Sequence, residues 1–431
     1  MLTSDDIRHV FIEFFTRRGH SEIPGASLLP DNDTTVLFTS AGMQPLVPYF
    51  SGREHPRGRR LVNYQRCLRT SDIDEVGDDS HLTCFEMLGN WSLGDYFKRD
   101  SLGWSLELLT DGFGLDRDRL CVSVYAGDDA VAFDRESHDR WLELGMPAER
   151  IHRFGREQNW WGPPGPYGPC GPDSEIFYWT GEGDPEGDPE SDERWIEVWN
   201  NVFIAFELTA DGHYRPLGRH NVDTGLGLER LTRVLQDARS VYDTDLFTPI
   251  RRRVRELSTV ADERAERIVC DHLRAAVLLV GDGVRPSNTD QGYVLRRLVR
   301  RAIREGRRLG MSGPFVRSVG EAVIERYASV YPHLGEQRQE ILAVLDGEET
   351  RFGRTLQRGL REIDRLVERC DDVDGRVLFG LFETHGLPPE LTVEELRAHG
   401  VELEGWREEF ERCRREHQQR SRQGSERAAR G

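Results

Sequence analysis

TCFEMLGNWSLGDYFK, residues 83–98, is the stretch that decides the fold of this chain. It opens with a short β-rich run and ends where a helix is expected to start. NYQRCLR (63–69) is a second strand pattern, and a short acidic loop separates the two, so together they predict an antiparallel hairpin. The last residue, Lys98, is the only lysine in the chain. It indicates either a surface position that escaped a drift toward arginine or a residue constrained by an active site.

Further β-rich runs lie between about residues 35 and 230, with one helical stretch near 131–145. Because the runs do not alternate regularly with helices, they favour an antiparallel sheet over a doubly wound one. A helix precedes them, with apolar residues at helical spacing from Ile7 to Phe14 and a cap at Thr3 or Ser4. The runs are TVLFTS (35–40), RLVNYQRCLR (60–69), TCFEML (83–88), CVSVY (121–125), EIFYW (175–179) and RWIEVWNNVFIAFEL (194–208).

After about residue 245 helical periodicity dominates, with much Arg and Glu. The sequence therefore predicts an α+β fold: a sheet domain over 1–248, and a mainly α-helical domain over 249–431 whose charged C-terminal helix gives way to a disordered tail.

Composition narrows the class of protein. Hydrophobic residues make up 37% and charged residues 31%, which is typical of a globular protein with adequate cores. No apolar run approaches the length of a membrane span, and the N-terminus is not signal-like. The seven cysteines include no C-x-x-C pair, so a reducing cytoplasm is expected rather than a disulfide framework or a Cys-rich zinc site. A net charge of −18 argues against indiscriminate coating of nucleic acid.

One segment is locally basic. In GYVLRRLVRRAIREGRRLG (292–310), seven arginines fall on one side of a helix and apolar residues on the other, and Glu305 is the only acid. Such a face either pairs with acids elsewhere or contacts a phosphate backbone. The scarcity of acids within the segment favours the second interpretation.

HNVDTGLGLERL (220–231) is rich in glycine but has neither of the phosphate-loop spacings. It does offer Asp223, and Arg230 could present a bidentate cation to a phosphate. In the hairpin, Arg69 could hold an α-phosphate while the ring of Phe85 covers a base.

These elements together resemble the three signature motifs of the class II aminoacyl-tRNA synthetases, and the surrounding words resemble the alanyl-tRNA synthetase family. The matching words occur in that family's order over about residues 1–395. They are LFTSAGMQP, QRCLR, FEMLGNWSLGDYFK, GPCGPDSEI, EVWNNVF, VDTGLGLER, DGVRPSN and GYVLRRLVRRAIR.

The resemblance implies an enzyme that activates L-alanine with ATP and Mg²⁺ and esterifies tRNA(Ala). It implies an antiparallel sheet flanked by helices, followed by a helical tRNA-recognition domain. The substrate carboxylate would attack the α-phosphorus, so catalysis would consist of positioning and charge neutralisation. The sequence does not indicate the metal ligands. The expected contacts are Arg69, Phe85, Glu86 and Arg230 with ATP; Trp161, Asn200, Val202, Asp223 and Gly225 with alanine; and Asn288, Arg296, Arg297, Arg300, Arg301, Arg304 and Glu390 with tRNA.

The chain also departs from the family pattern. TSDIDE (70–75) is shorter and more acidic than the family's loop, and Cys84 replaces a usual Phe. Glu390 replaces the Asp that, with the residue matched by Asn288, recognises a G·U pair of the acceptor stem. The family's editing and oligomerisation regions find no counterpart, so the chain is expected to be either part of a longer protein or a short paralogue.

Three hypotheses follow. The leading one is alanine activation and charging of tRNA(Ala). The alternative keeps the activation chemistry but transfers alanine to a small acceptor such as a nucleoside-like metabolite, because of the short loop and Glu390. A third is a non-catalytic tRNA-binding paralogue.

Overall fold

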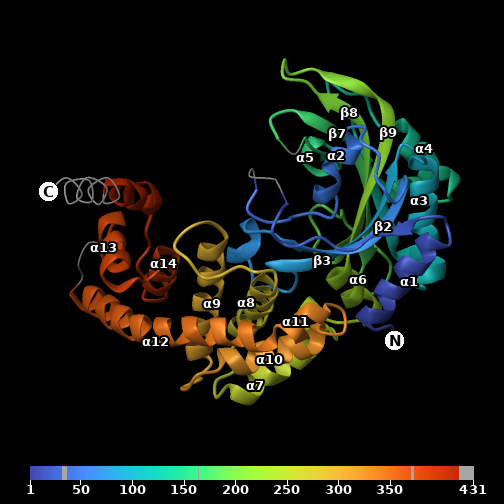
Figure 1. The fold of residues 1–431 in the computed structure, drawn as a ribbon. Helices are drawn as coiled ribbons and strands as arrows, with labels where there is room; N and C mark the ends of the chain where they lie inside the picture. Colours follow the sequence, from blue (N-terminus) through green and yellow to red (C-terminus); the bar gives the residue numbers. More distant parts are fainter. Residues whose placement is uncertain (32–35, 164, 370–372, 417–431) are drawn as a thin grey trace. The chain divides into compact units, whose positions relative to one another are not determined.

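The computed structural model describes residues 1–31, 36–163, 165–369 and 373–416 (Figure 1). The chain divides into two compact units, residues 1–252 and residues 253–431. The first unit contains α1 (Ser4–Thr16), β1 (Ser21–Glu22), α2 (Val47–Phe50), β2 (Arg60–Leu68), β3 (Cys84–Leu93), α3 (Lys98–Glu107), β4 (Leu120–Tyr125), α4 (Arg135–Glu143), β5 (Ile151–Phe154), α5 (Arg156–Asn159), β6 (Trp160–Trp161), β7 (Gly168–Trp179), β8 (Trp195–Leu208), β9 (Tyr214–Gly227) and α6 (Leu228–Leu235).

The first helix forms as its sequence predicts. The Thr3 side chain accepts from the backbone N–H of Asp6, and the Asp6 side chain accepts in return, which is a capping box. Ile7, Phe11 and Phe15 are fully buried and fix α1 to the core of the first unit. The buried stripe therefore follows the predicted helical spacing, one residue beyond Phe14 at its end.

The first unit is built on a mixed sheet with strand order β1-β2-β3-β9-β8-β7-β4-β5, and β6 pairs with β7. The predicted α+β class is confirmed. The interior pairs are antiparallel, as predicted, but β1–β2 and β4–β5 are parallel. The predicted antiparallel pairing thus holds for the interior of the sheet and not for its two edges, where crossover connections return short strands to the sheet.

One local prediction from the sequence is corrected, and the place of a second segment becomes clear. Residues 36–40 of TVLFTS contain no strand; Thr39 instead exchanges backbone hydrogen bonds with Leu28 and Leu68. The glycine-rich HNVDTGLG (220–227) forms the second half of β9, between β3 and β8. Alternating small residues suit a central strand here because neighbouring side chains fill the space above them.

The second unit is helical. Its long helices α8 and α9 pack on each other and on α10 and α12, and a further helical segment covers residues 406–416. The predicted disordered tail, 417–431, lies outside the described residues. The helices are α7 (Thr248–Leu257), which spans the boundary, α8 (Glu263–Gly281), α9 (Asp290–Arg308), α10 (Val316–Tyr327), α11 (Pro332–Glu336), α12 (Arg338–Arg369), α13 (Gly375–His385) and α14 (Pro389–Ala398).

Within the part of the chain that the structure describes, no helix is both long enough and apolar enough to span a bilayer.

Candidate functional sites

A cavity of the first unit lies at one end of the β2–β3 hairpin. It draws residues from the loop after β2, from β3, β8 and β9, and from the first turn of α6. Its lining residues are Arg69, Asp72, Ser80, His81, Leu82, Phe85, Met87, Glu197, Gly225, Gly227, Glu229 and Arg230.

Arg69 and Phe85, predicted to form a nucleotide clamp, do meet in this cavity. The guanidinium of Arg69 lies 4.9 Å from the centroid of the Phe85 ring. The backbone N–H of Arg69 donates to the carbonyl of Thr83 at 3.0 Å, which extends the hairpin by one bond beyond β2. The exposed Arg69 is thereby held over the half-buried ring of Phe85. The guanidinium is suited to a phosphate and the ring to a base.

Glu86, predicted to contact ATP, faces the other way. Side chains alternate along a strand, so Phe85 and Met87 line the cavity while Glu86 points to the opposite face. There its carboxylate accepts from Arg8 of α1, with Nε at 3.0 Å, and both side chains are buried. The expectation is therefore corrected: the Glu86 side chain joins α1 to β3. Its backbone N–H donates to Glu229 of α6 at 3.0 Å, which joins the strand to the cavity wall.

Arg230, in the first turn of α6, is paired with Glu197 of β8 at 2.5 Å. Both side chains are partly exposed, and both line the cavity. Among the described residues, no three His, Cys, Asp or Glu side chains gather as a metal site. A magnesium ion on a nucleotide needs only one or two protein carboxylates beside the phosphates. Glu197 meets that requirement, so the residues fit such an ion.

Asp223, the expected partner of the substrate ammonium, is buried on β9. Its Oδ1 accepts from the indole N–H of Trp91 at 2.7 Å. Burial raises the pKa of Asp223 to about 7, although the bond from Trp91 favours the ionised form. An ammonium group bound beside Asp223 would supply the positive charge that a buried ionised carboxylate needs.

The other residues expected around alanine gather near Trp91. Val202 stands opposite Asp223 in the β8–β9 register and shares a buried cluster with Trp91, against which Trp161 packs. Asn200 stands opposite Gly225 in the same register. A Cβ on Gly225 would come within 2.9 Å of the Met87 sulfur, so a larger residue there would have to displace the Met87 side chain.

Trp91 was not among the site residues that the sequence indicated. It is fully buried, it binds Asp223, and it touches the cluster that holds Val202. The available signal was its place in FEMLGNW (85–91), six residues after Phe85, where strand alternation puts both side chains on the same face. The sequence did not indicate its partner, because that depends on the register of β3 against β9.

Two further acids were also missed. Burial raises the pKa of Asp173 to about 8 and, together with the nearby Glu197, the pKa of Glu175 to about 9. Asp173 accepts from the Asn159 amide at 2.9 Å and lies opposite Val202 in the β7–β8 register. Acids within a strand that is buried along most of its length were the only sequence signal.

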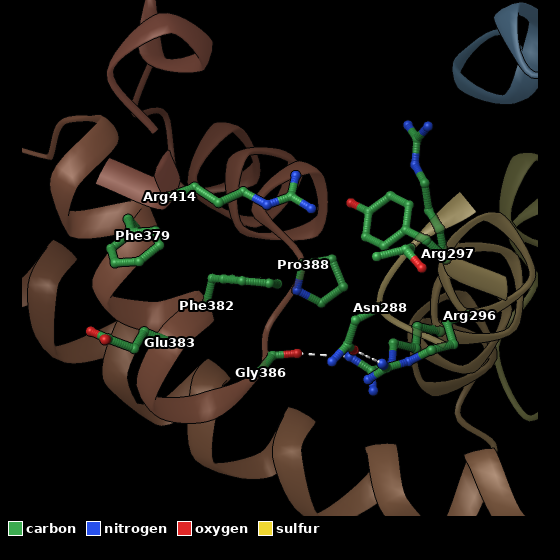
Figure 2. A pocket seen from close by; sticks show the side chains of 12 residues that line it. Asn288, Arg296, Arg297, Phe379, Phe382, Glu383, Gly386, Pro388 and Arg414 are labelled. Atoms are coloured by element: carbon green, nitrogen blue, oxygen red, sulfur yellow. Dashed lines mark hydrogen bonds between the residues drawn. The ribbon is translucent and has the colours of Figure 1, made fainter. Parts of the chain in front are cut away.

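The second unit contains a separate cavity of about 450 Å³. Figure 2 shows Arg414, Phe379 and Phe382 on one side of it and Arg296 and Arg297 on the other. Asn288, Arg296, Arg297 and Arg300, all predicted to contact tRNA, line it. The remaining lining residues are Thr289, Tyr293, Phe379, Phe382, Glu383, Gly386, Pro388 and Arg414.

Asn288 has a defined amide orientation. Arg296 donates to its Oδ1 and, at 3.2 Å, to the carbonyl of Ser287 (Figure 2). Arginine has no acceptor, so the amide oxygen must face it. The NH₂ of Asn288 is thereby left to donate elsewhere.

The expected cationic stripe on α9 is turned inward at Arg300, Arg301 and Arg304. Arg300 donates to Glu348 of α12 and to the carbonyl of Gly386, both at 2.7 Å. Arg304 donates to Glu394 at 2.9 Å and to Glu395 at 2.7 Å. Arg301 is buried as well, with Glu394 at 3.4 Å.

The prediction of an open phosphate-contacting face is therefore corrected for Arg301 and Arg304, which are buried and do not line the cavity. Their acids come from α14, so the pairing could not be seen within the segment 292–310.

Comparison with known proteins gives a family match over most of the chain. The family model described as tRNA synthetases class II (A) matches residues 6–430. An alanine–tRNA ligase of Treponema pallidum is 47% identical over 448 residues, covering 100% of this chain and 74% of that protein. Alanine–tRNA ligases of Borrelia hermsii and Rubrobacter xylanophilus are 44% and 43% identical over 99% of this chain, which spans 74% and 51% of their lengths.

A solved structure of Staphylococcus aureus histidyl-tRNA synthetase in the apo form matches at 14% identity and a TM-score of 0.34. It covers 53% of this chain and 64% of that one, a likeness too low to carry an argument.

Proposed function

The chain belongs to the family of class II (A) tRNA synthetases, and we propose that it activates L-alanine with ATP and transfers the alanyl group to tRNA(Ala). In the first step the alanine carboxylate oxygen bonds to the α-phosphorus, and the bond from that phosphorus to the bridging oxygen breaks. Alanyl-adenylate forms and pyrophosphate leaves. In the second step a ribose hydroxyl attacks the alanyl carbonyl, and AMP leaves.

One observation carries the activation proposal: Arg69, Phe85, Gly225 and Arg230, from four separate segments, line one cavity. Two guanidinium groups are suited to polyphosphate charge, and an aromatic ring is suited to a base. The reaction needs no protein nucleophile, so placing the substrate and neutralising the leaving pyrophosphate supply the catalysis. Glu197 would hold a magnesium ion, which contributes further neutralisation of phosphate charge when bound.

Alanine would lie between Asp223 and the cluster around Trp91. The ionised Asp223 would receive the ammonium group, and Trp161 and Val202 would limit the depth available to the side chain. A pocket of this kind rejects a smaller or hydroxylated analogue only modestly, because one methylene is worth about 1–3 kcal/mol.

The acceptor stem would bind at the cavity of the second unit. Asn288 lines this cavity and offers an amide donor, and Glu390, which does not line it but is bonded to the lining residue Tyr293, offers a carboxylate acceptor. In a minor groove, the guanine 2-amino group is the distinctive donor and the other base edges present acceptors. A carboxylate and an amide NH₂ therefore form a pair suited to a guanine-containing base pair, with Arg296 and Arg297 near the phosphates.

The alternative acceptor, a small nucleoside-like molecule, has one observation in its favour. The short loop after Arg69 forms a 3₁₀ turn at Ser71–Asp74, and its Asp72 lines the cavity. A carboxylate at this place would repel the phosphates of an incoming RNA end.

Two assays test the proposal. We expect alanine-dependent exchange of pyrophosphate into ATP, and charging of tRNA(Ala) with labelled alanine. Arg230→Ala should lower the exchange rate by about 100-fold or more, as loss of a donor to developing charge does. Arg297→Ala should lower kcat/KM for charging about 3- to 10-fold and leave exchange within about twofold.

Arg317→Ala is the matched control for the second variant, because Arg317 is a partly exposed arginine of the same unit outside the cavity. Folded protein without exchange would contradict activation altogether. Exchange without charging of any tRNA would favour the small acceptor.

A further inference from the structure

Tyr293 and Glu390 meet although 97 residues separate them in the chain. Tyr293 lies in the first turn of α9 and lines the cavity of the second unit. Glu390 is the second residue of α14. The tyrosine hydroxyl donates to Glu390 Oε2 at 3.3 Å, a long bond for an O–H donor.

The two helices carrying these residues are also held at a second point. Further along α9, Arg304 binds Glu394 and Glu395 of α14 at 2.9 and 2.7 Å. Two separate contacts fix the direction of one helix on the other, whereas one contact would leave it free to pivot. The backbone that carries Glu390 is therefore set by the Arg304 contacts, and the Tyr293 bond acts on the side chain.

The tyrosine is a donor at all physiological pH values. Burial and the neighbouring Glu390 charge raise the pKa of Tyr293 to about 12, against the smaller opposing effects of Arg297 and Arg414. The phenol therefore keeps its proton beside the carboxylate. One carboxylate oxygen takes this bond, and a carboxylate has a second oxygen that can accept another.

We propose that Tyr293 is a positioning residue for base recognition: its hydroxyl holds one oxygen of Glu390 so that the other accepts from a guanine amino group of the acceptor stem. The inference rests on the proposed function and deepens it. A glutamate has one more rotatable bond than an aspartate, so it needs a tether to present its carboxylate in one place. An untethered carboxylate would lose selectivity more than binding, because the phosphate contacts of the cavity arginines stay in place.

The test is Tyr293→Phe, which removes only the hydroxyl. Charging would be measured on two RNA hairpins that reproduce the acceptor stem, one with a G·U pair and one with G·C at the same position. We expect the ratio of the two kcat/KM values to fall about 3- to 10-fold, with alanine-dependent exchange within about twofold. Tyr331→Phe, in the same unit but outside the cavity, should leave the ratio unchanged.

A double-mutant cycle separates positioning from packing. Glu390→Asp shortens the side chain beyond reach of the hydroxyl, so Tyr293→Phe should change nothing further in that background. Equal losses in both backgrounds, or an unchanged ratio in Tyr293→Phe with normal charging, would overturn the inference and leave the proposed function standing. Wild-type protein that exchanges pyrophosphate but charges neither hairpin would overturn both the tRNA acceptor and this inference.

Discussion

At the scale of single residues, the lone lysine is explained by its surroundings. Lys98 begins α3 and is buried, and its Nζ lies 2.6 Å from Asp134, the N-cap residue of α4. It lies 5.5 Å from the ring centroids of Phe97 and Phe203. A compact ammonium fits between a carboxylate and two rings where a planar guanidinium would need more room. Lys98 therefore joins two helices and does not line either cavity.

Removing that charge should destabilise the first unit. Lys98→Met leaves Asp134 buried without its cation, which costs about 3–5 kcal/mol in comparable cases. Arg99→Met is the matched control on the same helix, because Arg99 is exposed and its pair with Glu143 is worth about 1 kcal/mol or less. Urea unfolding followed by tryptophan fluorescence measures both. Equal midpoints for the two variants would refute the structural role.

Asp223 should give alanine binding a pH dependence. Its pKa in the folded protein is about 7, above the value near 4 of a free aspartate, so the folded chain keeps this proton between about pH 4 and 7. An ammonium ligand needs the ionised form. The KM for alanine in the exchange assay should therefore fall as the pH rises from 6 to 8 and then level off.

Two variants test whether Asp223 is the titrating group. Asp223→Asn should raise the KM and remove this dependence. Trp91→Phe removes the indole donor that favours the ionised carboxylate, so the midpoint should move to higher pH. A wild-type profile that is flat from pH 6 to 8 would contradict the assignment.

At the scale of elements, α9 both lines the cavity of the second unit and holds α12 and α14 through ion pairs. Its first turns bring Tyr293, Arg296 and Arg297 to the cavity, whereas Arg300 and Arg304 bind acids of α12 and α14. A helix that presents cations on one side can serve both purposes because α14 covers only part of that side. The position of Glu390 therefore depends on ion pairs of residues that do not line the cavity.

Arg304→Met should destabilise the second unit by about 3 kcal/mol or more, because it leaves Glu305, Glu394 and Glu395 without their shared cation. Arg317→Met, in the same unit at a partly exposed pair with Asp346, should cost about 1 kcal/mol or less. Urea unfolding followed by far-ultraviolet circular dichroism measures both.

One combination of stability and charging activity would contradict this prediction. If Arg304→Met unfolds like Arg317→Met but charges tRNA poorly, then Arg304 contacts the acceptor and the original interpretation of the stripe holds for that residue.

At the scale of the whole molecule, each unit contributes a cavity with its own chemistry. The sheet unit gathers two arginines and an aromatic ring beside a buried acid. The helical unit gathers four arginines beside an amide with a defined donor. Activation and acceptor recognition are thus expected to respond separately to substitution, which is why the exchange and charging assays can be interpreted independently.

Much of the site could be predicted from the sequence because its residues belong to short motifs of neighbouring residues. Arg69, Phe85, Asp223 and Arg230 sit in short motifs whose spacing places them on one hairpin or at one strand-to-helix junction. The fold class followed from the change from β-rich runs to helical periodicity near residue 245. These features depend on residues close together in the chain, so they can be recognised without a structure.

Other features were decided only by the tertiary structure. Glu86 was assigned to ATP, but strand alternation turned it toward Arg8. Arg300 and Arg304 were assigned to RNA, but their acids lie 48 and 91 residues further along the chain. Trp91 became the partner of Asp223 through strand register. The physical reason is the same in each case: the partner of a buried charge or polar group comes from a distant segment, and only packing brings the two together.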